Sequence, residues 1–119
     1  MEYLNKVELI GRLGDHYNEE QIADEVIRYK FQLRIENAYK SLSGAEVRTV
    51  TWVNASFLSH PGMPAKFRGF IFRPKAFIHI LGRLRVAESF AQGRDTAIAY
   101  EVAVSEWEYP EPKEEEGAK

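Results

Sequence analysis

Val47–Leu58 reads VRTVTWVNASFL, and this stretch decides the fold of the chain. Val, Thr, Trp and Phe dominate it and it contains neither Pro nor Gly, so it is predicted to form an extended strand. Successive side chains of a strand point to opposite faces, so one face would carry Trp52 among polar neighbours. An aromatic side chain in that setting either stacks on nucleic-acid bases or packs under a loop. The opposite face would lie on the core and consist of Val47, Thr49, Thr51, Val53, Ala55 and Phe57.

The length and composition bound the class of protein. A chain of 119 residues favours one domain with a single core. The lack of Cys excludes disulfides, a thiolate zinc site and a cysteine nucleophile. No apolar run approaches about 20 residues and no leader pattern is present, so a soluble cytoplasmic protein is expected. The net charge is −2, and the last ten residues alone account for it with four Glu and two Lys. A nucleic-acid site would therefore need local clustering of cations.

Four further segments have the composition of strands. The clearest is Glu25–Ala38, EVIRYKFQLRIENA, in which apolar and polar residues alternate strictly and the polar face carries three cations. Such cations usually face solvent. Lys75–Arg85 is apolar on both faces as far as Gly82, as a buried or interface strand would be. The other two strands are expected over Leu4–Leu13 and Thr96–Trp107.

The segments between these strands are predicted to be connections. Ser59–Pro64, SHPGMP, breaks regular structure. Ala65–Phe72 is predicted to form a short helix, which Gly69 weakens. Loops or hairpin turns are expected at Asp15–Glu25, Tyr39–Glu46 and Val86–Asp95.

This order of elements predicts an all-β fold. Five short strands fit a five-stranded Greek-key barrel of the OB type, with a short irregular or helical segment between strands 3 and 4. A five-stranded meander and an open roll use the same strands and remain alternatives. Residues 1–109 would form the domain, and residues 110–119 a short acidic disordered tail.

Two motifs resemble the bacterial single-stranded DNA-binding protein family. Asn5–Gly14, NKVELIGRLG, is similar to the opening strand of that OB-fold family, and Phe77–Leu84, FIHILGRL, resembles its fourth strand, which ends in Gly, a variable residue and Leu. Trp52 stands where the family has the Trp of its third strand. The spacing from the second motif to TAIAYEVAV also matches, so the resemblance covers roughly residues 4–107.

The resemblance implies a function and a set of contacts. It implies sequence-independent binding and protection of single-stranded DNA in replication, recombination and repair, by a homo-oligomer (tetramer or dimer) associated with the nucleoid. The family's base-stacking aromatics fall on Trp52, Tyr39 and Phe90, whereas Leu58 replaces a further aromatic. Candidate phosphate contacts, chosen partly by strand face, are Lys6, Arg12, Arg34, Arg48, Arg83 and Arg85.

The sequence departs from the family in two regions. Ser59–Pro74 replaces the regular helix of the family with an aromatic segment that Pro and Gly interrupt. The tail has neither the long linker nor the acidic tip with terminal hydrophobic residues through which the family recruits replication and repair enzymes. Recruitment by that route is therefore not expected. A paralogue, a phage or mobile-element version, or a primosomal relative would fit the short tail.

An enzyme is not expected, nor is a cofactor. His16, His60 and His79 lack metal-ligand spacing, and His79 is expected to be packed or in an interface. No nucleophile elbow and no phosphate-binding loop before a helix is present. The alternative function, which the near-neutral charge favours, is an OB-type protein-interaction or primosome-type accessory module with weak or no DNA binding.

Overall fold

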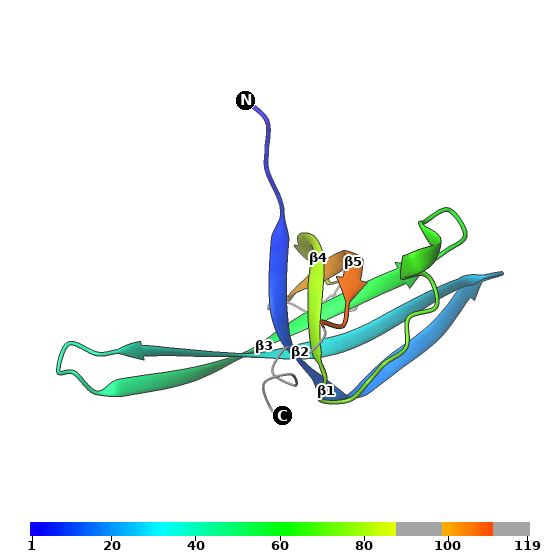
Figure 1. Ribbon diagram of the computed structural model, residues 1–119. Coiled ribbons are helices and arrows are strands. Elements are labelled where there is room, and N and C mark those ends of the chain that lie inside the picture. Colours follow the sequence, from blue (N-terminus) through cyan, green and yellow to red (C-terminus); the bar gives the residue numbers. More distant parts are fainter. Residues whose placement is uncertain (88–98, 111–119) are drawn as a thin grey trace, which may run out of the picture.

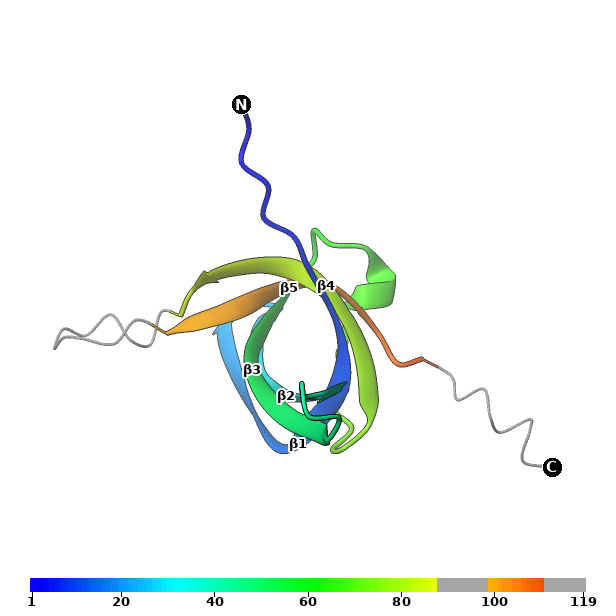
Figure 2. The same ribbon diagram turned by 90° about the vertical axis from the view of Figure 1, so that its left-hand side faces the viewer.

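The computed structural model of the protein describes residues 1–87 and 99–110. Its five strands close into a barrel with the order β1-β2-β3-β5-β4, seen along the barrel axis in Figure 2. Because β5 lies between β3 and β4, and pairs in parallel with β3, the fold is neither a meander nor an open roll. The predicted Greek-key barrel is confirmed. Its strands are β1 (Val7–Ala23), β2 (Val26–Lys40), β3 (Glu46–Ser59), β4 (Phe77–Val86) and β5 (Tyr100–Glu108).

The core is built from alternate residues of the strands, as the sequence pattern predicts. Tyr29, Phe31 and Leu33 of β2 are buried. The predicted core face of β3 is only partly right, because Ala55 and Phe57 are buried whereas Thr49 and Thr51 are exposed. The outer halves of β2 and β3 leave the barrel as a two-stranded arm, which extends to the left in Figure 1. The other fully buried large side chains are Leu13, Ile78, Ile80 and Val102.

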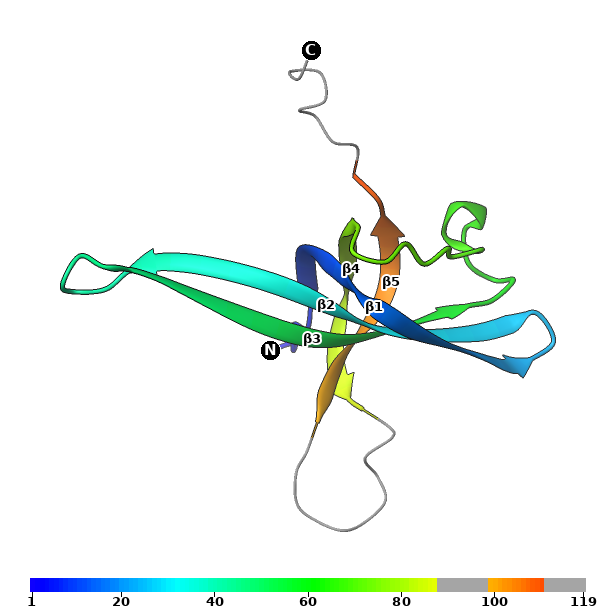
Figure 3. The same cartoon turned by 90° about the horizontal axis from the view of Figure 1, so that it is seen from below.

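The loop predicted at Asp15–Glu25 is wrong. After a register shift beyond Leu13, β1 continues to Ala23 and pairs with the first half of β2, forming a second hairpin on the opposite side of the barrel from the arm (Figure 3). Polar residues of this segment stand opposite basic ones in the ladder, with Asn18 opposite Lys30 and Glu20 opposite Arg28. Cross-strand pairs of opposite charge stabilise a ladder, so the polar segment forms a strand without apolar alternation.

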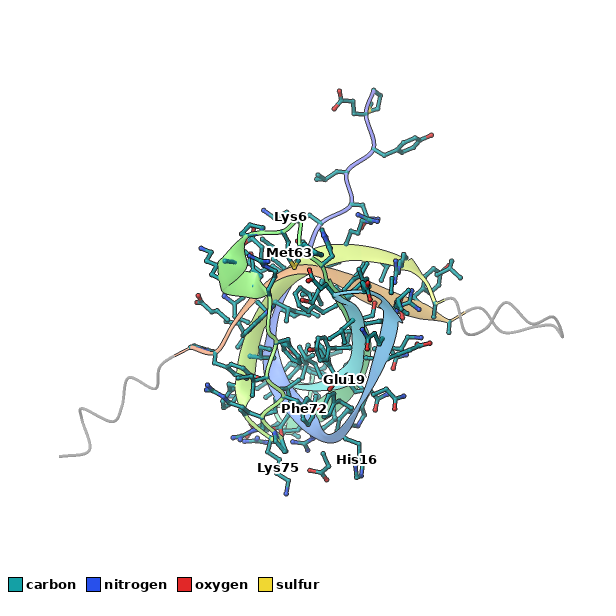
Figure 4. All side chains as sticks on the ribbon, turned by 90° about the vertical axis from the view of Figure 1, so that its right-hand side faces the viewer. Lys6, His16, Glu19, Met63, Phe72 and Lys75 are labelled. Atoms are coloured by element: carbon teal, nitrogen blue, oxygen red, sulfur yellow. The ribbon has the colours of Figure 1, made fainter. Side chains whose placement is uncertain are left out.

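The helix predicted at Ala65–Phe72 is reduced to one turn, so the segment between β3 and β4 is mostly irregular, as the fold prediction allowed. The only helical element in the described residues is a single 3-10 turn, η1 (Ala65–Phe67). Gly69 has a φ of 72°, a conformation outside the helical region. The aromatic side chains of the segment pack against the core instead, and Phe70 is buried in it. Figure 4 looks along the barrel at this end, with Met63 and Phe72 on opposite sides of the opening.

The remaining strand boundaries shift by a few residues. The Asn5 side chain exchanges two hydrogen bonds with the Leu84 backbone, 2.8 and 2.9 Å long, and so extends the β1–β4 pairing toward the predicted start at Leu4. The turn expected at Tyr39–Glu46 is shorter, since β2 ends at Lys40. Most of the loop predicted at Val86–Asp95 lies outside the described residues, as do residues 96–98 of the predicted last strand and residues 111–119 of the predicted tail.

Tyr109 joins the end of β5 to the segment before β4. Its hydroxyl donates to the Ile71 carbonyl at 2.7 Å and accepts from the Arg73 N–H at 3.2 Å, and burial raises the pKa of Tyr109 above its usual range. We expect Tyr109→Phe to lower the free energy of unfolding by about 1–2 kcal/mol, because two hydrogen bonds are lost. Urea denaturation would measure this. The matched control Tyr3→Phe, at a fully exposed position, should change stability by less than about 0.5 kcal/mol.

The raised pKa of Tyr109 also predicts alkaline sensitivity. The fold favours the neutral hydroxyl, so this stabilisation is complete below the ordinary pKa of about 10 and is lost as the pH rises through the folded-state pKa. The loss of stability above pH 10 should be smaller in Tyr109→Phe than in the wild type. Equal losses in both proteins would contradict this assignment.

Candidate nucleic-acid interface

A row of four outward side chains crosses four neighbouring strands of the barrel. The strand register places Phe77 of β4 beside Arg12 of β1, Arg12 beside Arg34 of β2, and Arg34 beside Trp52 of β3. The two aromatic side chains at the ends are half exposed, 50% for Phe77 and 52% for Trp52. We call these four residues the outer row. It combines aromatic rings, which can stack on bases, with cations that can contact phosphates.

Local contacts hold each member of the outer row. The Arg12 guanidinium lies 4.3 Å from the centre of the Phe77 ring, within cation–π range. Arg34 forms an ion pair with Glu36, two residues further along β2, so part of its charge is already balanced. Trp52 lies next to Gly14 of β1, where an added Cβ would be 3.6 Å from the indole. The indole therefore packs beside the β1 backbone, and a Cβ at position 14 would make only an ordinary contact with it.

The same face continues along β2 and β3 toward the opposite hairpin. The Gln32 side chain donates to the Asn54 side chain at 2.9 Å, and Lys30 stands opposite Ser56 in the ladder. On the opposite, inner face of the β1–β2 hairpin, the side-chain hydrogen bond to Glu19 raises the pKa of Tyr17, and desolvation raises it further. Asn54 and Ser56 share the polar face on which the sequence placed Trp52. A continuous outer surface of cations and amides therefore leads away from the indole.

Three residues of this surface are not among the predicted contacts: Lys30, Arg28 and Phe77. The alternation of Glu25–Ala38 put Arg28 and Lys30 on the polar face, so a signal for those two was present. No sequence signal places Phe77 beside Arg12, because that neighbour relation depends on the pairing of β4 with β1.

Two of the predicted aromatic residues, Tyr39 and Trp52, do not share one surface. Tyr39 pairs with Val47, and Trp52 with Arg34, in an uninterrupted register. Since side chains alternate between the faces of a strand pair, Tyr39 lies on the opposite face of the arm from Trp52. Phe90 falls outside the described residues.

The predicted cations are distributed over several places. Arg12 and Arg34 belong to the outer row. Arg48 lies further along the arm on the face of Trp52, with an ion pair of 3.4 Å to Glu46. Lys6 is exposed just before β1, labelled in Figure 4. Two others, Arg83 and Arg85, lie on β4 beside β5.

Arg85 is held in a polar cluster with a buried carboxylate. Its Nε atom donates to Oε2 of Glu101 at 2.8 Å, and its terminal nitrogen donates to the Ser56 hydroxyl at 3.1 Å. Glu101 is only 5% exposed. Burying a carboxylate is costly unless it is paired and hydrogen-bonded, so this ion pair satisfies Glu101 and also fixes the direction of Arg85.

Neither a metal-ligand cluster nor a membrane-spanning helix is found in residues 1–87 and 99–110. No group of three or more His, Asp or Glu side chains in this part of the chain could hold a metal ion. His79 is partly exposed, and its Nε2 atom lies 2.7 Å from Oε2 of Glu8. No helix in the described ranges is long and apolar enough to cross a membrane.

Comparisons with known proteins agree with the fold. No protein-family model matches the sequence, and no curated protein matches it. A Plasmodium falciparum SSB in complex with ssDNA matches with a TM-score of 0.76 and 14% identity, over 93% of this chain and 98% of that chain. The single-stranded DNA-binding protein of Thermus aquaticus matches with a TM-score of 0.70 and 20% identity, over 92% of this chain and 52% of that chain. The dimeric N-terminal domain of PriB from Thermoanaerobacter tencongensis matches with a TM-score of 0.58 and 14% identity, over 91% of this chain and 98% of that chain.

The similarity to these solved structures concerns the fold. At 14–20% identity they show the fold, which is the OB fold that the family resemblance implied. The chain spans about half the length of the Thermus aquaticus protein, 52%.

Proposed function

We propose that the protein binds single-stranded DNA without sequence preference, with bases stacked on Trp52 and phosphates contacted by the surrounding cations. The observation that carries the proposal is the outer row, in which the half-exposed Trp52 stands beside Arg34 and Arg12. The likeness to an SSB solved with ssDNA supports it. Chemically, this is a binding surface and not a catalytic site.

The physical basis is stacking combined with counterion release. Base–aromatic stacking contributes about 1–3 kcal/mol per base, and it tolerates any sequence because every base has a π-face. Each cation that replaces a counterion on a phosphate makes binding salt-dependent. The chain outside the tail has no net charge, so attraction depends on the local cations of the outer surface.

The full set of proposed contacts uses more than one surface. Arg48 continues the face of Trp52 along the arm, whereas Tyr39 would meet a strand that wraps around the arm edge. Phe90, Lys6, Arg83 and Arg85 complete the set that the resemblance implies.

We place this activity in DNA replication, recombination and repair in the cytoplasm, at the nucleoid. A homo-oligomer, dimer or tetramer, is proposed as the active form, and the dimeric state of the PriB domain supports this. The proposed domain covers residues 1–109, followed by the acidic tail.

Trp52→Ala tests the proposal. We expect it to weaken binding to oligo-dT by about 5- to 150-fold, which corresponds to the loss of about 1–3 kcal/mol of stacking. Fluorescence anisotropy of labelled oligo-dT would measure affinity at low salt and at about 0.2–0.3 M salt, where phosphate contacts weaken. Quenching of tryptophan emission in the wild type provides a second readout, and Trp107, packed against Phe57 and Phe70, contributes a background.

The matched control for Trp52→Ala is Val50→Ala. Val50 lies two residues away on the same face and is also exposed, so its loss should leave affinity within about twofold. If the wild type shows no binding to oligo-dT at either salt concentration, the proposal is wrong.

A second candidate function is a protein-interaction or primosome-type accessory module. The likeness to PriB and the absence of net charge outside the tail favour it. If this second function is right, the wild type should not bind oligo-dT at either salt concentration, and Trp52 should contact a protein partner.

A further inference from the structure

Lys75, just before β4, has a backbone conformation that a glycine would adopt more easily. Its φ is 66°, which lies in the left-handed region, where the Cβ atom of an ordinary residue crowds the following carbonyl oxygen. Among the described residues, Glu25 is the one other non-glycine residue in that region, with a φ of 61°. A strained residue persists only where the surrounding structure holds it, and it points to a function of its side chain.

Contacts with β1 hold the backbone of Lys75 in this conformation. Its N–H donates to the carbonyls of Leu13 and Gly14, at 3.1 and 3.4 Å. Its own carbonyl accepts a hydrogen bond of 3.3 Å from the Arg12 guanidinium. All these contacts use main-chain atoms of Lys75, so a glycine at this position would keep them. They account for the conformation of the backbone but not for the presence of a lysine.

The same contacts place Lys75 at the edge of the outer row. Gly14, which accepts from the Lys75 N–H, is also the residue of β1 beside which the indole of Trp52 packs. Arg12, which donates to the Lys75 carbonyl, belongs to the outer row and lies over the Phe77 ring. Only Gly14 therefore separates the backbone of Lys75 from the indole on which a base would stack.

The Lys75 ammonium is accessible to a ligand. The side chain is 75% exposed and points away from the barrel in Figure 4. It forms an ion pair of 3.8 Å with Asp15, whose side chain is 60% exposed. An exposed ion pair contributes little stability, so the ammonium can exchange Asp15 for a phosphate. The stretch from Ser59 to Ala87 contains no Asp or Glu, so the neighbours of Lys75 along the chain add no negative charge.

We infer that Lys75 binds a phosphate of the single strand whose base stacks on Trp52, and that the chain keeps a lysine in a glycine-like conformation for this contact. The inference rests on the proposed function and adds to the outer row a cation from the segment before β4. In this arrangement the lysine raises affinity for the strand while it lowers the stability of the fold. Its replacement should therefore change the two quantities in opposite directions.

Lys75→Gly separates the two effects. It relieves the backbone strain and keeps the main-chain hydrogen bonds, so the midpoint temperature of thermal unfolding should rise by about 2–5 °C. The loss of the ammonium should weaken binding of labelled oligo-dT by about 3- to 10-fold at low salt, as expected for one charged hydrogen bond. The slope of log K against log salt should become shallower by about 0.7, the value for one phosphate contact on a single strand.

Three variants serve as controls. Glu25→Gly relieves the same kind of strain in the turn between β1 and β2, so it should raise the midpoint temperature without weakening the binding of oligo-dT. Lys75→Arg keeps the charge and the strain, so affinity should stay within about twofold and the salt slope should not change. Lys66→Ala removes an equal charge from the exposed turn η1 and should also leave affinity within about twofold, because salt screens distant charges.

Asp15→Asn tests the contact in the opposite direction. It removes the carboxylate that competes with a phosphate for the Lys75 ammonium, so binding of oligo-dT should become about 2- to 3-fold tighter. The same substitution in Lys75→Gly should give a smaller gain, because the two side chains are coupled. Equal gains in both backgrounds would show that Asp15 acts without Lys75, which would count against the inference.

The outcomes separate this inference from the proposed function. If the wild type does not bind oligo-dT at either salt concentration, the proposed function fails. If the wild type binds, and Lys75→Gly gains stability with unchanged affinity and salt slope, Lys75 does not contact a phosphate and the inference is wrong. A lower midpoint temperature in Lys75→Gly would show that the lysine side chain supports the fold, and this result would also overturn the inference.

Discussion

Phe70→Ala is expected to lower the free energy of unfolding by about 3–5 kcal/mol, the usual cost of removing a buried phenylalanine side chain. Phe70 is 4% exposed. Its ring centre lies 5.0–5.2 Å from those of Tyr29, Phe31 and Trp107, so β2 and β5 lose a common partner. The free energy of unfolding of such domains is about 5–15 kcal/mol. The midpoint temperature of thermal unfolding should therefore fall by roughly 10–20 °C in Phe70→Ala.

The adjacent residue provides the control. Ile71 is 63% exposed, and Ile71→Ala should change stability by no more than about 0.5 kcal/mol. Chemical denaturation of both variants would separate the contribution of the buried Phe70 from that of the exposed face of the same segment. A cost below about 1 kcal/mol for Phe70→Ala would mean that this segment does not close the barrel.

Gly82→Ala is expected to cost about 3 kcal/mol or more, or to prevent folding. Gly82 lies at the register shift between β4 and β5, where a Cβ would stand 2.1 Å from the Ala103 carbonyl oxygen. That atom belongs to the backbone of a paired strand, so it cannot move aside without loss of ladder hydrogen bonds. Overpacking of a rigid site is strongly destabilising.

Gly14→Ala is the matched control. A Cβ there meets its nearest atom at 3.6 Å, an ordinary contact, so the same substitution should change stability by about 1 kcal/mol or less. Thermal unfolding followed by circular dichroism would compare the two variants. Similar melting temperatures for Gly82→Ala and Gly14→Ala would contradict the observed packing of β4 on β5.

The strand pattern made much of the barrel predictable. Strict alternation in β2 assigned Tyr29, Phe31 and Leu33 to the core, and the short strands with their order along the chain indicated the Greek-key barrel. The two errors have one cause. The acidic end of β1 and the aromatic segment containing Phe70 take their structure from distant partners, and local propensity does not contain that information.

Part of the candidate site was also predictable. The face alternation of Val47–Leu58 placed Trp52 outward, and the half-exposed indole agrees with it. The same rule could not relate Tyr39 to Trp52, since their relative faces depend on which residues of β2 and β3 pair.

The sequence by itself determined which side chains share one face of a strand, because the two-residue period of a strand is a local property of the backbone. Only the tertiary structure decided which outward residues become neighbours. Barrel closure and strand register bring Phe77, Arg12, Arg34 and Trp52 into one row from four strands. A shift of one residue in any of these ladders would turn part of the row toward the core. The binding surface is therefore set by pairing between distant segments.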